Sequence, residues 1–254
     1  MKLTGAEVMV KCLQAEGVST IFGYPGGAIL PFYDALRDET SIRHILTAHE
    51  QGAAHAADGY ARASGTVGVC CATSGPGATN LVTGLANAFL DSIPVVAITG
   101  QVKRSTIGHD AFQEVDICGI TMPITKQNFL VNKPEELEQT MHLAFQIARS
   151  GRPGPVLIDV PNDVQKAMIE YHGKKLPALS PKAPDPMRID LAIDALSKAK
   201  RPVMLVGGGV AISGAQYEAV HLAEKLNLPC ASTLMGLGCI SSYRKQYLGM
   251  AGLH

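Results

Sequence analysis

The chain of 254 residues contains no tryptophan, and aromatic residues make up only 5% of it. Charge of either sign is also not in excess, because 22 basic residues balance 22 acidic ones and no long run of one sign occurs. A nucleic-acid-binding protein would be expected to show a basic surface interleaved with aromatic residues. We therefore expect a small-molecule ligand and no nucleic acid.

No apolar stretch reaches the roughly 20 residues needed to cross a membrane. The first residues, MKLTGAEVMVKCLQ, contain a T-x-x-E capping box at Thr4 and Glu7, which indicates an amphipathic helix and not a signal peptide. The six cysteines form no C-x-x-C pair and show no metal-ligand spacing with the eight histidines. These features predict a cytoplasmic protein with buried, reduced thiols and no membrane contact.

What the chain does contain is an alternation of β-forming and helical segments, and 46% hydrophobic residues to build a core. Short apolar runs at 67–72 and 94–99 are typical of buried parallel strands. Their alternation with helical patterns predicts an α/β fold with a parallel sheet and helices on both faces. One helix is expected from Gly75 to about Asp91, whereas residues 100–119 show no clear period.

A proline-rich stretch divides the chain. Residues 173–187, GKKLPALSPKAPDPM, hold four prolines and predict a semi-rigid, exposed connector. We predict a first domain at 1–170, a linker at 171–188 and a second α/β domain at 189–254. Two or three strands with two helices give this second domain a thin core, so we expect that it is incomplete within these residues.

The segment around which the chain is organised is IRHILTAHEQGAAHAADGYARASG, residues 42–65. Its β-forming residues change at His49 into an alanine-rich run that ends at Gly65, which predicts a strand, a tight turn and a helix. Glu50 then lies at the carboxyl end of a strand, where open parallel sheets bind ligands. Taken alone, the helix dipole explains an acidic residue there equally well. The small residues that follow would let a second subunit approach closely.

Three glycine-rich turns have both a ligand-binding and a structural explanation. Backbone at Gly26-Gly27 is open to a ligand, although a simple turn is locally favoured. TSGPGATN (73–80) begins a helix but lacks the G-K-[ST] of a Walker loop, and its Thr79 and Asn80 are equally well explained as capping residues. The triple glycine at 207–209 follows a strand without the Rossmann spacing G-x-G-x-x-G, so its dinucleotide signal is weak.

Several blocks resemble the thiamine-diphosphate enzymes, and most closely the acetolactate (acetohydroxyacid) synthase large subunits. They are FGYPGGAILPFYDAL (22–36), the segment around Glu50, TSGPGATN, LDSIPVVAITGQV (90–102), DAFQEVD (110–116) and SGRPGPVLIDVP (150–161). The resemblance implies a pyrimidine-binding domain, followed by the start of a central FAD-binding-type domain. It also implies decarboxylation of pyruvate on thiamine diphosphate and transfer of the two-carbon unit to pyruvate or 2-oxobutyrate, the first step of isoleucine and valine biosynthesis.

The resemblance also implies roles for individual residues. Glu50 would hydrogen-bond the aminopyrimidine and activate the cofactor, and Gln113 would have a catalytic role. Phe112 and Gln101 would line the substrate channel, although a core position is the local alternative for Phe112. Arg152 would bind FAD, or is instead a plain surface arginine. The remaining cofactor-binding residues implied are Pro25, Gly26, Gly27, Pro76 and Asn80 for thiamine diphosphate, and Gly207, Gly208, Gly209, Thr233, Leu234, Met235 and His254 for FAD.

The same resemblance predicts a homodimer or homotetramer with the cofactor site between subunits, and a possible regulatory small subunit. Mg²⁺ and the diphosphate would be held by a further domain with a G-D-G…N motif, which these residues lack, so we expect the chain alone to make no acetolactate. Three positions depart from the family pattern: Ala48, His109 and Asn162. Asn162 replaces a lysine that would attract 2-oxoacids.

Two alternatives remain open. One is another thiamine-diphosphate carboligase or acetyltransferase, such as sulfoacetaldehyde acetyltransferase. The other is a non-catalytic fragment that dimerises and binds FAD.

Overall fold

The computed structural model describes residues 1–177, 179 and 183–252. The chain divides into two compact units, Met1–Ser180 and Pro181–His254.

The first unit is built on a six-stranded sheet in which every neighbouring pair of strands is parallel, which confirms the predicted α/β fold. The strand order is β3-β2-β4-β5-β7-β6. All residues of β4, β5 and β7 are buried, as expected of apolar strands covered on both faces. The strands are β2 (Thr20–Gly23), β3 (Arg43–Leu46), β4 (Gly68–Ala72), β5 (Val95–Gln101), β6 (Gln127–Leu130) and β7 (Val156–Pro161).

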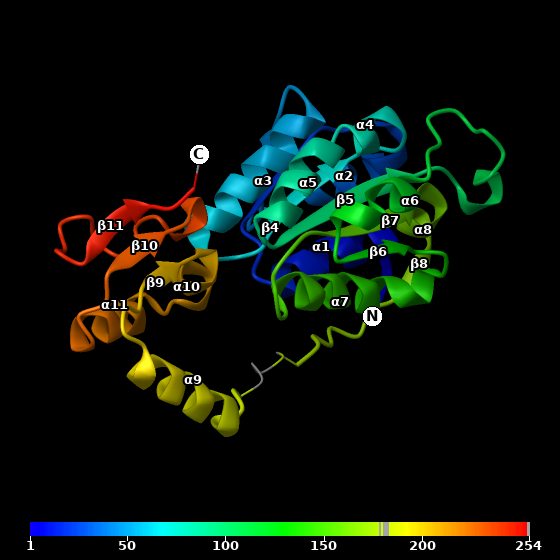
Figure 1. The fold of residues 1–254 in the computed structure, drawn as a ribbon. Helices are drawn as coiled ribbons and strands as arrows, with labels where there is room; N and C mark the ends of the chain where they lie inside the picture. Colours follow the sequence, from blue (N-terminus) through cyan, green and yellow to red (C-terminus); the bar gives the residue numbers. More distant parts are fainter. Residues whose placement is uncertain (178, 180–182, 253–254) are drawn as a thin grey trace. The chain divides into compact units, whose positions relative to one another are not determined.

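Helices cover both faces of this sheet (Figure 1). Helices α3 and α5 pack together on one face, and α1 and α7 pack together on the other. The capping box of Thr4 and Glu7 begins α1, as predicted. The helices are α1 (Gly5–Ala15), α2 (Leu30–Arg37), α3 (Glu50–Ser64), α4 (Pro76–Thr79), α5 (Val82–Leu90), α6 (Ile117–Thr121), α7 (Leu137–Arg149) and α8 (Asn162–Lys166).

The prediction of one helix from Gly75 to Asp91 is wrong, because the chain breaks between α4 and α5. At the break the amide of Leu81 donates to the Ala78 carbonyl, three residues back, so the last turn of α4 is tightened. The break lies at Asn80, whose side chain belongs to the candidate site.

A second, two-stranded antiparallel sheet was not predicted. It pairs β1 (Lys2–Thr4) with β8 (Met168–Glu170). Beyond it, Met1 and Tyr171 exchange two backbone hydrogen bonds, of 3.0 Å from the N-terminal amine and 2.8 Å from the Tyr171 amide. Strands of three residues carry too little alternation to be read from sequence.

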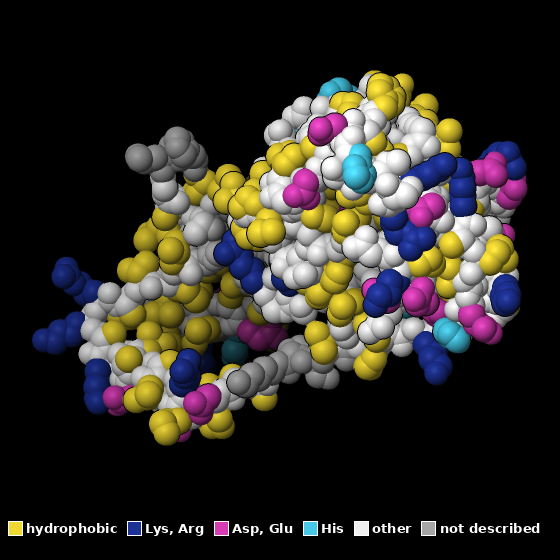
Figure 2. Space-filling view, turned by 90° about the vertical axis from the view of Figure 1, so that its right-hand side faces the viewer, with side chains coloured by type: hydrophobic (Ala, Val, Ile, Leu, Met, Phe, Trp, Pro, Cys, Tyr) yellow, Lys and Arg dark blue, Asp and Glu magenta, His cyan; other side chains and the backbone are white. Residues whose placement is uncertain are grey.

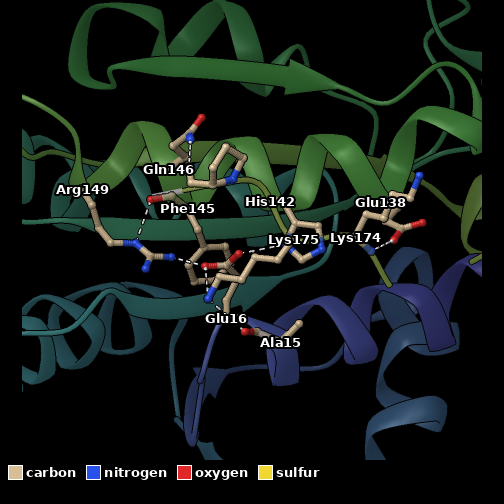
Figure 3. A network of polar contacts seen from close by, with 10 residues as sticks. Ala15, Glu16, Glu138, His142, Phe145, Gln146, Arg149, Lys174 and Lys175 are labelled. Carbon is tan, nitrogen blue, oxygen red and sulfur yellow. Dashed lines mark hydrogen bonds and ion pairs between the residues drawn. The ribbon is translucent and has the colours of Figure 1, made fainter. Parts of the chain in front are cut away.

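The start of the predicted linker is held to the first unit (Figure 3). Buried Glu138 of α7 accepts hydrogen bonds from the backbone amides of His172, at 2.9 Å, and Lys174, at 3.1 Å. The Gln146 side chain donates to the carbonyl of Pro177 over 2.7 Å. Residues 172–177 therefore lie along α7, and we define them as the docked segment.

Beside the docked segment lies the buried carboxylate of Glu16, the residue that follows α1. It accepts a hydrogen bond from His142 Nδ1 at 2.8 Å and forms ion pairs with Arg149 and, at 3.7 Å, with Lys175 (Figure 3). Burial opposes its ionisation, but the His142 hydrogen bond and the two cations outweigh burial and lower the pKa of Glu16. The carboxylate thus joins α1, α7 and the docked segment.

The second unit contains a three-stranded parallel sheet in the order β11-β10-β9. Its core is small, as expected, and α9 buries none of its residues. Helix α10 and strand β11 were not predicted. The elements are α9 (Pro186–Lys198), β9 (Met204–Val206), α10 (Gly208–Ser213), α11 (Gln216–Lys225), β10 (Cys230–Ser232) and β11 (Tyr247–Met250).

Charges of both signs are interspersed on the face shown in Figure 2, in keeping with the balanced composition. Among the helices that the structure describes, none combines the length and the apolar character needed to span a membrane. All six cysteines are free, and five are buried, as predicted. Burial raises the pKa of Cys71 to about 12, so this thiol is a poor nucleophile.

Candidate functional site

Glu50 is the first residue of α3, as predicted. The chain leaves β3 at Leu46 and reaches the helix through His49, whose Nδ1 accepts the Gln51 amide at 3.1 Å. This imidazole cap satisfies one of the amides that every helix N-terminus leaves free. The half-buried carboxylate of Glu50 therefore lies just beyond the carboxyl edge of the parallel sheet.

Asn80 fixes one oxygen of this carboxylate. Its Nδ2 donates to Oε2 of Glu50 over 2.9 Å, across thirty positions of sequence. Asn80 is also the C-cap residue of α4, and the Thr79 hydroxyl donates to the Pro76 carbonyl, so both residues cap this helix while the Asn80 side chain holds Glu50. Oε1 of Glu50 has no hydrogen-bond partner in the described part of the chain. One oxygen is held, and the other remains available.

Gly77 packs directly against Thr73 beside that available oxygen. A Cβ at Gly77 would lie 3.3 Å from Oε1 of Glu50 and only 2.7 Å from Cγ2 of Thr73. Both contacts are tighter than ordinary van der Waals distances, so no larger residue fits here without movement. Thr73 belongs to the TSGPGATN block but was not singled out, since threonine gives no local signal.

The two glycines at 26 and 27 have different surroundings. Gly26 has an extended backbone that any residue adopts, but its Cβ would lie 2.5 Å from Cγ2 of Thr73. Close packing on Thr73 therefore requires glycine there. A Cβ at Gly27 would have no described heavy atom within 4 Å, and Gly27 lines an open groove beside α2. Gly27, which follows Pro25 and Gly26, is thus the open backbone position.

Two further polar side chains that sequence reasoning missed line the same groove. The hydroxyl of Tyr33 lies 3.2 Å from His44 Nε2 and 3.2 Å from the sulfur of Cys71. Burial raises the pKa of Tyr33, and the charge of Glu50 raises it further, so Tyr33 stays neutral. Burial lowers the pKa of His44.

Gln101, predicted to line a substrate channel, is buried and is the last residue of β5. Its Nε2 donates to the Val115 carbonyl at 3.0 Å and to Oδ2 of Asp159 at 2.8 Å, and its Oε1 accepts the Val102 amide. These bonds close the base of the loop 102–116. Burial raises the pKa of Asp159 to about 6, against the hydrogen bonds that it accepts from Thr99 and Gln101.

The loop 102–116 presents Phe112, whose exposed fraction is 88%, so the alternative of a core position is wrong. Its neighbour Gln113 has a positive φ of 58°. The carbonyl oxygen of Gln113 would lie 2.6 Å from a Cβ on Gly75, which places the loop directly against the turn before Pro76. The exposed ring and the turn with Pro76 and Gly77 are therefore joined through Gln113.

In the second unit, the carboxyl ends of β9 and β10 bring most of the predicted FAD residues together. The Thr233 amide donates to the Val206 carbonyl at 2.9 Å, and a Cβ on Gly208 would lie 2.9 Å from Cβ of Met235. Packing alone thus explains the glycine at 208, whereas a Cβ at Gly209 would meet nothing described within 4 Å. The residues gathered at this edge are Gly207, Gly208, Gly209, Thr233, Leu234 and Met235.

Two predicted FAD residues lie elsewhere. Arg152, in the first unit, donates to Ser92 Oγ at 2.6 Å and to the Leu90 carbonyl at 3.0 Å, so it satisfies the last turn of α5. It is exposed, in agreement with the alternative of a surface arginine. His254 lies outside the described residues.

The three departures from the family pattern differ in their contacts. Ala48 and His109 are exposed. Asn162 begins α8, and its Nδ2 donates to the Ala28 carbonyl at 3.3 Å.

Within the described residues, no three or more His, Cys, Asp or Glu side chains converge as metal ligands would.

Comparison with known proteins decides the family. Residues 3–120 match the family model "Thiamine pyrophosphate enzyme, N-terminal TPP binding domain", and residues 189–254 match "Thiamine pyrophosphate enzyme, central domain". The chain belongs to the thiamine pyrophosphate enzymes. Thiamine pyrophosphate is the thiamine diphosphate of the resemblance, so that prediction is confirmed.

Several known proteins align with this chain over nearly its whole length. The "Probable acetolactate synthase large subunit" of Methanocaldococcus jannaschii is 55% identical over 259 residues, which cover 99% of this chain and 44% of that protein. The "Acetolactate synthase large subunit" of Corynebacterium glutamicum is 49% identical over 257 residues, covering 100% and 41%. That of Haemophilus influenzae is 46% identical over 259 residues, covering 100% and 45%. The chain therefore spans less than half the length of these relatives.

The geometry around Glu50 fits the aminopyrimidine of this family's cofactor. The edge of such a ring carries hydrogen-bonding nitrogens, which need an acceptor or donor beside them. The available Oε1 of Glu50 can supply one. Close packing of Gly77 on Thr73 borders that oxygen.

Proposed function

We propose that this chain supplies the Glu50 side of the cofactor site in an acetolactate synthase. Such an enzyme decarboxylates pyruvate and joins the two-carbon unit to a second 2-oxoacid, pyruvate or 2-oxobutyrate, at the start of isoleucine and valine biosynthesis. Identities of 46% to 55% to proteins of that name, over nearly the whole chain, support the proposal.

The observation that carries the proposal is the carboxylate of Glu50, with Oε2 held by Asn80 and Oε1 available beside Gly77. Thiamine diphosphate, when bound, supplies a carbon that stabilises negative charge. Glu50 holds or releases a proton at Oε1, toward the pyrimidine ring. Asn80 orients the carboxylate, and Pro25, Gly27 and Pro76 line the approach.

The remaining assignments belong to the same proposal. Phe112 and Gln113, which belong to the loop 102–116, face the 2-oxoacid, and Gln101 positions that loop. FAD binds the residues at the carboxyl ends of β9 and β10, and Mg²⁺ binds outside this chain. A second copy of the protein completes the cofactor site, a smaller regulatory subunit associates with it, and the enzyme works in the cytoplasm.

The test replaces Glu50 by glutamine in the complete polypeptide that carries these residues. Glu50→Gln keeps the shape but removes the carboxylate, so we expect acetolactate formation from pyruvate to fall about a hundredfold or more. Glu7→Gln is the matched control, because Glu7 also lies in the first turn of a helix but only caps α1.

Unchanged turnover in Glu50→Gln would refute the proposal. Identification of the product separates this activity from that of other carboligases, since the proposal requires acetolactate as the main product from pyruvate alone.

A further inference from the structure

The backbone of Ala28, next to the Gly26-Gly27 turn, is held at both its amide and its carbonyl. Its amide donates to Oγ1 of Thr73 over 3.1 Å. Its carbonyl accepts two hydrogen bonds from α8, one from Gln165 Nε2 at 2.8 Å and one from Asn162 Nδ2 at 3.3 Å. Elements more than 130 positions apart in sequence thus meet at the backbone of one residue.

Gln165 is fully buried, which is costly for an amide unless its polar atoms are paired. Its Nε2 donates to the Val160 carbonyl, also at 2.8 Å, besides that of Ala28. Because only the amide nitrogen of Gln165 can donate to these two carbonyls, the orientation of the side-chain amide is fixed. Its Oε1 has no partner in the described chain. An apolar side chain would fill this place at lower cost, so packing alone does not account for glutamine here.

The strand below the turn is shaped to receive it. A Cβ on Gly100 of β5 would lie 2.7 Å from the carbonyl carbon and oxygen of Ala28 and 2.8 Å from the amide nitrogen of Ile29. The missing side chain lets the turn rest directly on the sheet. Ala28 is therefore fixed by β5 below, by α8 at its carbonyl and by Thr73 at its amide.

Thr73 links this arrangement to the carboxylate. Its hydroxyl accepts the Ala28 amide, and its methyl group contacts the positions where Gly26 and Gly77 lack a Cβ. Gly77 in turn borders Oε1 of Glu50. A displacement of Ala28 would therefore move Thr73 and change the space beside Glu50.

We propose that Gln165 and Asn162 are positioning residues, which hold the Ala28 carbonyl and thereby set the Gly26-Gly27 turn against Thr73 beside Glu50. The inference rests on the proposed function of Glu50. It also gives Asn162 a role that a lysine at the same position could fill, because a lysine also donates hydrogen bonds.

The first experiment measures amide hydrogen exchange at Ala28 and Ile29 in the 254-residue chain. Gln165→Met keeps the side-chain length and removes both donors, so exchange at Ala28 should become about tenfold faster or more, while amides of β5 are unchanged. Lys166→Met is the matched control, since Lys166 is exposed on the same helix. Unchanged exchange at Ala28, or an equal rise in β5, would overturn the proposal.

The second experiment measures turnover in the complete polypeptide. Asn162→Leu removes the donor at similar size without adding charge, and we expect kcat to fall about tenfold with KM for pyruvate within about twofold, because misplacement acts on the transition state. Asn162→Lys should retain kcat. Loss of activity in Asn162→Lys as in Asn162→Leu, or a fall in neither, would overturn the positioning role.

The outcomes separate the two proposals. Full activity in Glu50→Gln refutes the function, whatever Ala28 does. Normal exchange at Ala28 in Gln165→Met refutes the positioning role, even if Glu50 proves essential.

Discussion

At the scale of single residues, the carboxylate of Glu50 is oriented by one neutral amide. Replacing that amide by a carboxylate, as in Asn80→Asp, would bring two acids to hydrogen-bond distance where the bond is now 2.9 Å. Like charges this close raise the pKa of one acid, so we expect the acid limb of the pH profile of kcat/KM to move up by about one unit.

Asn87→Asp is the matched control for this prediction. Asn87 donates to buried Asp58 at 2.6 Å, so the substitution creates the same repulsion away from the site. It should lower the unfolding free energy by roughly 1–3 kcal/mol and leave the acid limb in place. An equal shift in both variants would contradict the assignment of Asn80.

The ionisation of Asp159 should make the unfolding free energy of the protein depend on pH. Its pKa is raised from an ordinary 3.8 to about 6, because it is buried in the sheet. The folded state thus binds the proton of Asp159 more tightly than the unfolded chain does. The contribution of Asp159 to the unfolding free energy is therefore complete below pH 4 and is lost as the pH rises to 6. The loss is about 3 kcal/mol.

Asp159→Asn removes this contribution. We therefore expect the difference in unfolding free energy between the variant and the original protein to change between pH 4 and pH 6, measured by urea unfolding at several pH values. A difference that is independent of pH would mean that Asp159 titrates normally.

At the scale of helices and strands, the packing of α3 on α5 depends on glycine. A Cβ on Gly84 would lie 2.4 Å from Cβ of Ala54. Gly84→Ala should therefore lower the unfolding free energy of the chain by about 1–3 kcal/mol, measured in urea. Gly59→Ala on the outer side of α3, where a Cβ meets nothing described within 4 Å, should raise it by about 0.5–1 kcal/mol. A loss of stability in both variants would contradict this prediction, because Gly59 would then be needed for packing as Gly84 is.

The sequence predicted those elements whose signal is local. Apolar runs gave the buried strands, and the turn at His49 gave the start of α3 at Glu50. The three-residue strands β1 and β8 carry no such signal. The hydrogen bonds from Asn80 to Glu50 and from α8 to Ala28 join segments that are distant in sequence. The residues next to Asn80 or Ala28 in the sequence do not indicate these partners. For Phe112, residue type alone left a core position open beside the substrate channel, and the loop that exposes it is organised by Gln101 and Glu114.

At the scale of the whole molecule, the docked segment is held by few bonds. Glu138 supplies two of them, so Glu138→Ala should release residues 172–177 and make the chain about tenfold or more sensitive to trypsin after Lys174 and Lys175. Glu135→Ala is the control, since Glu135 is exposed near the start of α7. Equal cleavage rates in both variants would show that Glu138 does not hold the segment.

The pairing of β1 with β8 has a consequence for synthesis. The first strand has no partner until residues 168–170 have been made, which at about 5–20 residues per second takes on the order of ten to thirty seconds. Helix α1 packs on α2, which is made early, and on α7, which is complete only at Arg149. Until then the side of α1 that packs on α7 is uncovered as the chain leaves the ribosome, and it is a ready substrate for chaperones.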